Sequence, residues 1–252
     1  MGHLSNAAAR PFRRSFLSLA LREPADNHAC MTDAPIKDAA TIVLLRRDQD
    51  ETRILMGQRG AKAVFMPDKF VFPGGRVDTS DHDLPQAVPA DPAERARLNS
   101  HTSADMADAL TNAAIRELWE ETGLVMGRDT TTSHAAHPDW QGFYDMNMIP
   151  DASHLKYFFR AITPPGRPRR FDARFFLGEA TGIVGDLDDF SNASGELSHL
   201  QWVSLTAARQ FSLPFITEIV LSEVEDILNA PNAARSIPFF SHSDDGPAFR
   251  SI

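Results

Sequence analysis

The strongest constraint on the fold is an alternation of short apolar runs, typical of β-strands, with two longer segments of helical periodicity. Such alternation favours an α/β arrangement over an all-β or an all-α one. In residues 214–229 the apolar side chains recur every three or four positions, which is the spacing of one helix face. The expected strands are Ala40–Leu45, Arg53–Gln58, Lys69–Phe72, Lys156–Thr163, Ala173–Glu179 and His199–Ser204, and the expected helices are Asp105–Thr122 and Pro214–Asn229.

Composition and charge exclude several classes of protein. A length of 252 residues with 42% hydrophobic residues suits one large α/β domain or two small ones. A formal net charge of −9 argues against a nucleic-acid partner, whose phosphates would need neutralising by cations. No apolar run is long enough to cross a bilayer, and the single cysteine, Cys30, cannot form an internal disulfide. We therefore expect a cytoplasmic protein with neither nucleic acid nor membrane as a partner.

The chain divides into three parts by pattern. Residues 1–35 are expected to be a flexible N-terminal extension; a targeting peptide and a translation start at Met31 are the alternatives. Residues 36–234 form the predicted folded domain. Within that domain, residues 79–104 are rich in Asp, Pro, Ala, His and Ser and are predicted to be an inserted loop. Residues 235–252 are predicted to be an irregular C-terminal tail.

Three glutamates in the first predicted helix share one face. Glu117, Glu120 and Glu121 stand at positions i, i+3 and i+4, where side chains are neighbours on a helix. Like charges at this spacing destabilise an isolated helix by about 0.2–0.5 kcal/mol per pair. A bound Mg²⁺ ion would remove that repulsion, because it takes oxygen ligands from carboxylates. The alternative is an ordinary solvated helix face.

The neighbourhood of the glutamates favours a site over a solvated face. An apolar stripe beside them places the carboxylates at the edge of the core, and it consists of Leu110, Ala114 and Leu118. Gly123 follows the helix and can end it in a left-handed conformation. Upstream, Gly74 and Gly75 end a predicted strand, so we expect a tight turn with exposed backbone amides there.

The segment 116–124 resembles the second half of the Nudix box, which reads Arg-Glu-aliphatic-any-Glu-Glu-any-Gly-aliphatic. Residues Phe72–Gly75 resemble the usual entry to the box. Asp81 stands where the family pattern has a glutamate, six residues after Gly75. Residues 82–115, which number 34, separate Asp81 from Arg116. The family pattern has seven residues between these two positions, so this segment is longer by 27 residues. The spacing leaves the role of Asp81 open.

The resemblance covers about Ile36–Asn229 and implies a fold and an activity. The implied fold belongs to the α/β class. It is a Nudix-type α/β/α sandwich with a central mixed β-sheet and an insertion between the Gly-Gly turn and the catalytic helix. The activity is hydrolysis of the diphosphate bond in a nucleoside diphosphate derivative. The expanded box, with Phe72–Asp78 and Arg170–Phe176, resembles peroxisomal-type coenzyme A diphosphatases and their bacterial relatives. Coenzyme A or an acyl-coenzyme A is therefore the favoured substrate; ADP-ribose, NADH or another dinucleotide, and a non-catalytic nucleotide sensor, are the alternatives.

The same resemblance implies roles for individual residues. Glu120 and Glu121 would be the principal ligands of Mg²⁺ or Mn²⁺. Glu117 would be a further ligand or the group that orients or deprotonates the attacking water. Arg116 would keep the glutamates aimed or contact a phosphate, and the backbone of Gly74 and Gly75 would approach the metal or the substrate phosphates.

Further candidates rest on charge alone. Arg76, Arg59 and Arg174 are candidate phosphate contacts, and we group Arg76 with the two glycines as substrate-binding. One more carboxylate from outside the box is expected, and Glu179 and Glu196 are equally placed near strand ends. The expected partner is a small-molecule nucleoside diphosphate, and a homodimeric assembly is left open.

Overall fold

The computed structural model describes residues 34–48, 51–82, 84, 87–103, 105–131, 137–243 and 246–252. Nearly all of the predicted N-terminal extension lies outside these residues. Among the described residues, no helix is long and apolar enough to cross a membrane. In chain order the elements are β1 (Ile36–Arg47), β2 (Thr52–Arg59), β3 (Phe70–Val71), β4 (Gly74–Arg76), η1 (Thr79–Asp81), α2 (Pro92–Asn99), α3 (Met106–Thr122), β5 (Val125–Asp129), α4 (Pro138–Asp145), β6 (Met148–Pro150), β7 (Lys156–Ile162), β8 (Arg170–Glu179), η2 (Ala180–Gly182), β9 (Ile183–Val184), β10 (Leu197–Ser204), α5 (Leu205–Ala208), α6 (Phe215–Asn229), β11 (Pro238–Ser243) and β12 (Gly246–Ser251).

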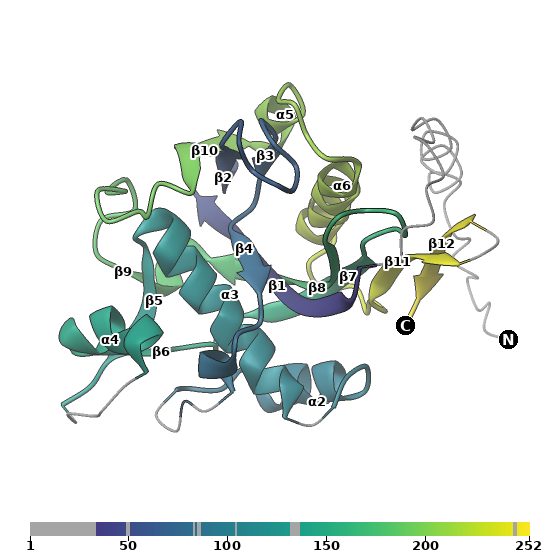
Figure 1. Ribbon diagram of the computed structural model, residues 1–252. Helices are drawn as coiled ribbons and strands as arrows, with labels where there is room; N and C mark the ends of the chain where they lie inside the picture. The colour runs from purple at the N-terminus through teal and green to yellow at the C-terminus, as the bar shows by residue number, and fades with distance from the viewer. Residues whose placement is uncertain are drawn as a thin grey trace, which may run out of the picture.

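A mixed sheet forms the centre of the molecule, with helices on both faces (Figure 1). The order of its main path is β10-β2-β1-β8-β7-β11-β12, with β3 on β2 and β4 on β1. β1 runs parallel to β8 from Ile36 opposite Arg170 to Leu45 opposite Glu179, whereas its pairing with β2 and that of β7 with β8 are antiparallel. The predicted central mixed sheet is confirmed. A smaller sheet, β6-β5-β9, lies beside it.

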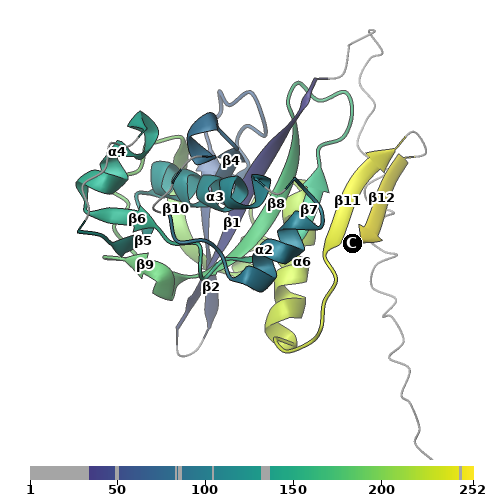
Figure 2. The ribbon, with the colours of Figure 1, turned by 90° about the horizontal axis from the view of Figure 1, so that it is seen from below.

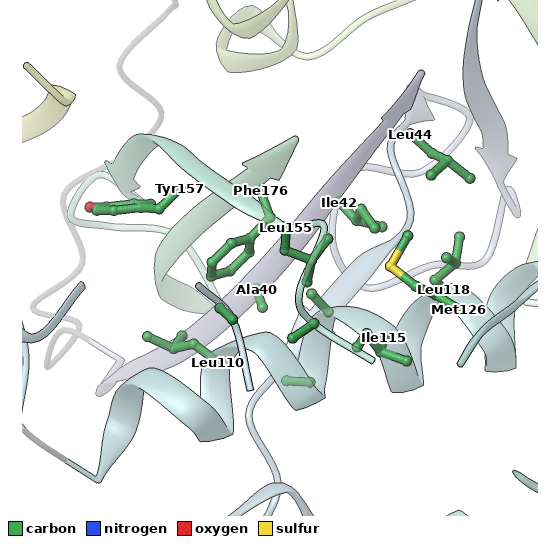
Figure 3. Packing of buried hydrophobic residues seen from close by; sticks show 14 of the residues in the cluster. Ala40, Ile42, Leu44, Leu110, Ile115, Leu118, Met126, Leu155, Tyr157 and Phe176 are labelled. Atoms are coloured by element: carbon green, nitrogen blue, oxygen red, sulfur yellow. The ribbon is translucent and has the colours of Figure 1, made fainter. Parts of the chain in front are cut away.

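The alternation of side chains along β1 separates two buried layers. Ile42 and Leu44 belong to the cluster that contains Leu118 of α3, whereas Val43 belongs to the cluster that contains Val220 of α6. Successive residues of a strand point to opposite faces, so this continuous apolar strand contributes buried side chains to both layers. Figure 3 shows the first layer, where α3 packs its apolar stripe against β1. The α/β/α sandwich is confirmed.

The helix that carries the glutamates begins and ends where its sequence indicates. α3 follows Asp105 and is closed by Gly123, whose φ of 78° is left-handed. The amide of Gly123 donates to the carbonyl of Trp119 at 2.7 Å, which satisfies one of the last carbonyls of the helix. The glutamates therefore lie in the last two turns of a helix with a fixed end.

The segment predicted to be an inserted loop, 79–104, is partly helical. It contains η1 and α2, and the Asp91 side chain accepts the Ala93 amide at 2.8 Å to cap α2. Leu98 of α2 is buried in the cluster under α3. The loop prediction was wrong for these residues because a polar helix needs only one buried side chain to pack in place, and that leaves a weak periodic signal.

The prediction that residues 235–252 form an irregular tail is also wrong. β11 and β12 form an antiparallel hairpin at the end of the main sheet (Figure 2). β11 joins the sheet by parallel pairing with β7, with Phe239 opposite Arg160. Phe239 and Phe240 are both buried, whereas the Ser and Gly-Pro residues around them are typical of loops. Tertiary pairing overrides the weak local strand propensity of this segment.

Candidate active site

The two glycines lie in a strand and not in the predicted tight turn. Gly74–Arg76 form β4, which pairs antiparallel with β1 so that Gly75 stands opposite Ala40. A Cβ atom on Gly74 would lie 2.6 Å from the Ala40 carbonyl oxygen and 2.7 Å from the Thr41 Cα. Only glycine permits so close an approach of β4 to β1, and this reason for the diglycine differs from turn formation.

Two of the three glutamates lie directly on these glycines. The Gly74 amide donates to Oε2 of Glu121 at 2.9 Å. A Cβ atom on Gly75 would lie 2.3 Å from Oε1 of Glu117, so that carboxyl group occupies the space a side chain would need. The structure thus brings the diglycine and the helix together, although 41 residues separate Gly75 from Glu117 in the chain.

The glutamates differ in burial, so they do not form an ordinary solvated face. The exposed fractions of their side chains are 2% for Glu121, 13% for Glu117 and 37% for Glu120. Glu120 contacts Arg116 at the outer end of the group. In the part of the chain that the structure describes, no three His, Cys, Asp or Glu side chains are already arranged to hold a metal ion.

The electrostatics of the group favour a cation. Burial, helped by the charge of Glu120 and opposed by Arg116, raises the pKa of Glu117 from its ordinary 4.5 to about 7. Burial also raises the pKa of Glu121 well above its ordinary value, with Glu117 adding to the effect. A donor set made only of carboxylate oxygens, short of positive charge, suits a hard divalent cation such as Mg²⁺ or Mn²⁺. The residues present therefore fit the metal that the resemblance implies.

Arg116 is buried and bound to Asp81, the residue whose role the sequence left open. Nε and Nη2 of Arg116 donate to the two carboxylate oxygens of Asp81 at 2.9 and 3.0 Å. Asp81 is fully buried and also accepts the amide of Asp78 at 2.8 Å. Nη2 of Arg116 donates in addition to the carbonyl of Arg76 at 2.9 Å. The chain insertion between Asp81 and Arg116 therefore leaves their contact intact.

The other end of the Arg116 guanidinium holds two glutamates. Nη1 donates to Oε1 of Glu117 and to Oε2 of Glu120, each at 3.0 Å. Burial by itself lowers the pKa of Arg116, but its bond to Asp81 and the charges around it raise the pKa above the ordinary value. Arg116 therefore stays charged and links Asp81 and β4 to the glutamates of α3.

The structure distinguishes the two carboxylates that the sequence could not. Nη2 of Arg59 donates to Oε1 of Glu196 at 2.7 Å, and Nη1 of the same arginine lies 3.9 Å from Oε1 of Glu121. The charge of Glu196 also raises the pKa of Glu117 and Glu121. Glu179 is bound to Arg47 at 2.8 Å. Glu196 and Arg59 therefore adjoin the glutamates of α3, and no sequence spacing indicated this.

The remaining arginines lie elsewhere. The Arg76 side chain is more than half exposed and bonds Asp78 at 2.8 Å, so only its backbone joins the Arg116 contacts. Arg174 is buried and paired with Asp38 and Asp172. Its prediction as a phosphate contact was wrong, because Asp172 and Asp38 already neutralise it inside the fold.

Comparisons with known proteins reveal likenesses in sequence and in fold. No protein-family model matches the chain. The chain is 29% identical over 178 residues to "Putative nudix hydrolase 7" of Caenorhabditis elegans, a match that covers 66% of this chain and 51% of that protein. It therefore spans about half the length of this curated relative. The crystal structure of a NUDIX hydrolase from Alicyclobacillus acidocaldarius superposes with a TM-score of 0.56 at 26% identity, and the match covers 79% of this chain and 94% of that one. The fold is a Nudix fold.

The Nudix likeness includes sequence as well as architecture. In this Nudix fold, α3 carries the second half of the box and β4 carries its diglycine entry. The names of both relatives describe them as Nudix hydrolases, and this chain resembles one in sequence and the other in sequence and fold.

Proposed function

We propose that this chain is a divalent-metal-dependent hydrolase of the diphosphate bond in a nucleoside diphosphate derivative, with coenzyme A or an acyl-coenzyme A as the favoured substrate. The observation that carries the proposal is the placement of buried Glu121 and Glu117 directly on Gly74 and Gly75. A cation held there would offset the buried negative charge and meet an anionic diphosphate at the same point.

In this proposal Glu120 and Glu121 hold Mg²⁺ or Mn²⁺, and Glu196 is the nearby carboxylate from outside the box. The bound ion supplies positive charge that neutralises the phosphate oxygens and the leaving group. Arg116 holds Oε1 of Glu117, which fixes the direction of the other carboxylate oxygen. We assign Oε2 of Glu117 to orienting the attacking water and accepting its proton.

The choice of coenzyme A rests on the expanded box and on the segments Phe72–Asp78 and Arg170–Phe176. ADP-ribose and NADH are the runner-up substrates, because substrate choice lies in loops outside the box. The single cysteine suits a reducing compartment, so we place the enzyme in the cytoplasm.

Incubation of the purified protein with coenzyme A, ADP-ribose and NADH in Mg²⁺, followed by chromatography of the products, tests the proposal. We expect metal-dependent cleavage with coenzyme A as the best substrate. Binding of these compounds without turnover would instead indicate a nucleotide sensor. The matched variant is Glu120→Gln, which removes a ligand charge and keeps the volume; full activity with an unchanged metal requirement in this variant would refute the metal assignment.

A further inference from the structure

The short helix α4 brings one more carboxylate to the edge of the site. Gly142 of α4 lies against the indole of Trp119, because a Cβ atom on Gly142 would stand 2.6 Å from Cη2 of that ring. Asp139 comes three residues before Gly142, and side chains three apart share one face of a helix. Asp139 therefore lies on the face of α4 that contacts α3, where Glu120 is the residue after Trp119.

A buried hydroxyl group holds Asp139 in place. Ser80 of η1 is 6% exposed, and its Oγ donates to Oδ2 of Asp139 at 2.9 Å. The next residue, Asp81, accepts a hydrogen bond from Arg116, whose Nη1 donates to Oε2 of Glu120 at 3.0 Å. A short series of contacts thus connects Asp139 to Glu120, and it passes through the start of the expanded segment of the box.

Asp139 contributes negative charge near Glu120. Among the residues that the structure describes, no lysine or arginine pairs with it. Nδ1 of His137 lies 3.2 Å from Oδ2 of Asp139, but that nitrogen accepts the Asp139 amide and so carries no proton in this contact. Burial raises the pKa of Glu120, Arg116 opposes this, and the charge of Asp139 adds to the rise. The charge of Asp139 therefore acts on the carboxyl group of Glu120.

We propose that Asp139, held by Ser80, strengthens the binding of the divalent cation at Glu120 through its charge and without ligating the ion. This rests on the proposed function, which places the cation at Glu120 and Glu121. Oδ2 of Asp139 is already engaged by Ser80 and His137, so the carboxylate acts from a distance. Ser80 is a positioning residue, because it acts only through Asp139. The expanded segment thereby contributes to the site through η1.

Calorimetric titration of the full chain with Mn²⁺ at pH 8, without substrate, tests the proposal. We expect Asp139→Asn to weaken binding about tenfold, the lower end of the range for residues outside the ligand set. The lower end applies because the Asp139 side chain is 43% exposed and solvent screens part of its charge. The matched control is Asp145→Asn, which removes an exposed carboxylate about 9 Å further along α4 and should change the affinity less than about twofold.

Three comparisons separate the charge of Asp139 from its shape. Asp139→Glu keeps the charge and should retain most of the affinity. The difference between the wild type and Asp139→Asn should shrink as ionic strength rises from about 0.05 M to about 1 M, because salt screens the charge. Ser80→Ala should weaken binding about threefold by itself and add nothing in the Asp139→Asn background, where no charge is left to place.

Mg²⁺-dependent hydrolysis gives a second readout. In Asp139→Asn the Mg²⁺ concentration for half-maximal activity should rise about tenfold, with kcat at saturating Mg²⁺ unchanged. A lower kcat at saturating Mg²⁺ would overturn the proposal, because it would make Asp139 a ligand. Wild-type Mn²⁺ affinity in Asp139→Asn would overturn it too and leave the proposed function standing. If the wild type binds no Mn²⁺, the proposed function fails and this inference fails with it.

Discussion

Two groups of charged side chains in this molecule are buried to a similar degree and differ in their balance of charge. We name the first the acid-rich cluster, and it consists of Asp81, Arg116, Glu117, Glu120 and Glu121. We name the second the paired cluster, and it consists of Asp38, Arg160, Asp172 and Arg174. In the paired cluster two carboxylates face two guanidinium groups, and Arg160 bonds Asp172 at 2.6 and 2.8 Å. In the acid-rich cluster there are four carboxylates for the one guanidinium of Arg116, which contacts Asp81, Glu117 and Glu120 but not Glu121.

The difference favours a structural role for the paired cluster and a ligand-binding role for the acid-rich cluster. The paired cluster neutralises itself, and the ion pair with Asp172 raises the pKa of Arg160. The acid-rich cluster keeps an excess of negative charge, and burial raises the pKa of Glu117, Glu120 and Glu121. A buried charge that the protein leaves unmatched indicates a ligand of opposite charge.

The largest expected effect is on stability, in the paired cluster. Asp172→Asn would remove the carboxylate shared by buried Arg174 and partly buried Arg160, so we expect a loss of about 3–5 kcal/mol in the free energy of unfolding. Urea denaturation measures this loss, and activity per folded molecule should stay unchanged. Asp188→Asn, which breaks an exposed pair with Arg46, should cost no more than about 1 kcal/mol. A loss for Asp172→Asn as small as that of the control would contradict the comparison.

In the acid-rich cluster the corresponding change should affect activity and spare the fold. Gly75→Ala places a methyl group 2.3 Å from Oε1 of Glu117, and the flexible carboxyl group must move away. We expect kcat to fall on the order of 100-fold, since a displacement of about 1 Å can have that effect. Gly60→Ala is the control, because a Cβ atom there meets nothing within 4 Å. Wild-type kcat in Gly75→Ala would show that the position of Glu117 is not critical.

Asp81 should have a smaller effect, because it acts through Arg116. Asp81→Asn removes the charge that anchors Arg116. Mutation of a residue that orients metal ligands in this way lowers activity or metal affinity by about 10–100-fold. We expect a lower kcat and a higher Mg²⁺ concentration for half-maximal activity, a change that simple loss of stability would not produce. Asp108→Asn alters a pair on the surface of the same helix and should leave both quantities unchanged.

The smallest expected effect is the pH dependence of stability without metal. The pKa of Glu117 is about 7 in the folded protein against an ordinary 4.5, so the folded state binds this proton more tightly than the unfolded state. In EDTA the wild type should therefore lose stability as pH rises from about 4.5 through 7. Glu117→Gln does not ionise, and at pH 8 we expect it to be more stable than the wild type by about 1–2 kcal/mol. Parallel stability curves for the two proteins between pH 5 and pH 8 would contradict this.

The sequence by itself determined the local elements of the site. The spacing of Glu117, Glu120 and Glu121 places them on one face of α3, and Gly123 ends that helix, because periodicity and capping depend only on neighbouring residues. The apolar runs likewise identified the central strands. Even so, the buried state of Glu121 and the strand conformation of the diglycine did not follow from these patterns.

Only the tertiary structure decided which distant residues meet. Asp81 reaches Arg116 across the expanded segment, Glu196 and not Glu179 lies beside Glu121, and Arg174 is neutralised inside the fold. The C-terminal hairpin is likewise held in the sheet by the parallel pairing of β11 with β7. The physical reason is that strand pairing and packing fix these contacts, whereas the number of intervening residues hardly constrains the distance between the ends of a long loop.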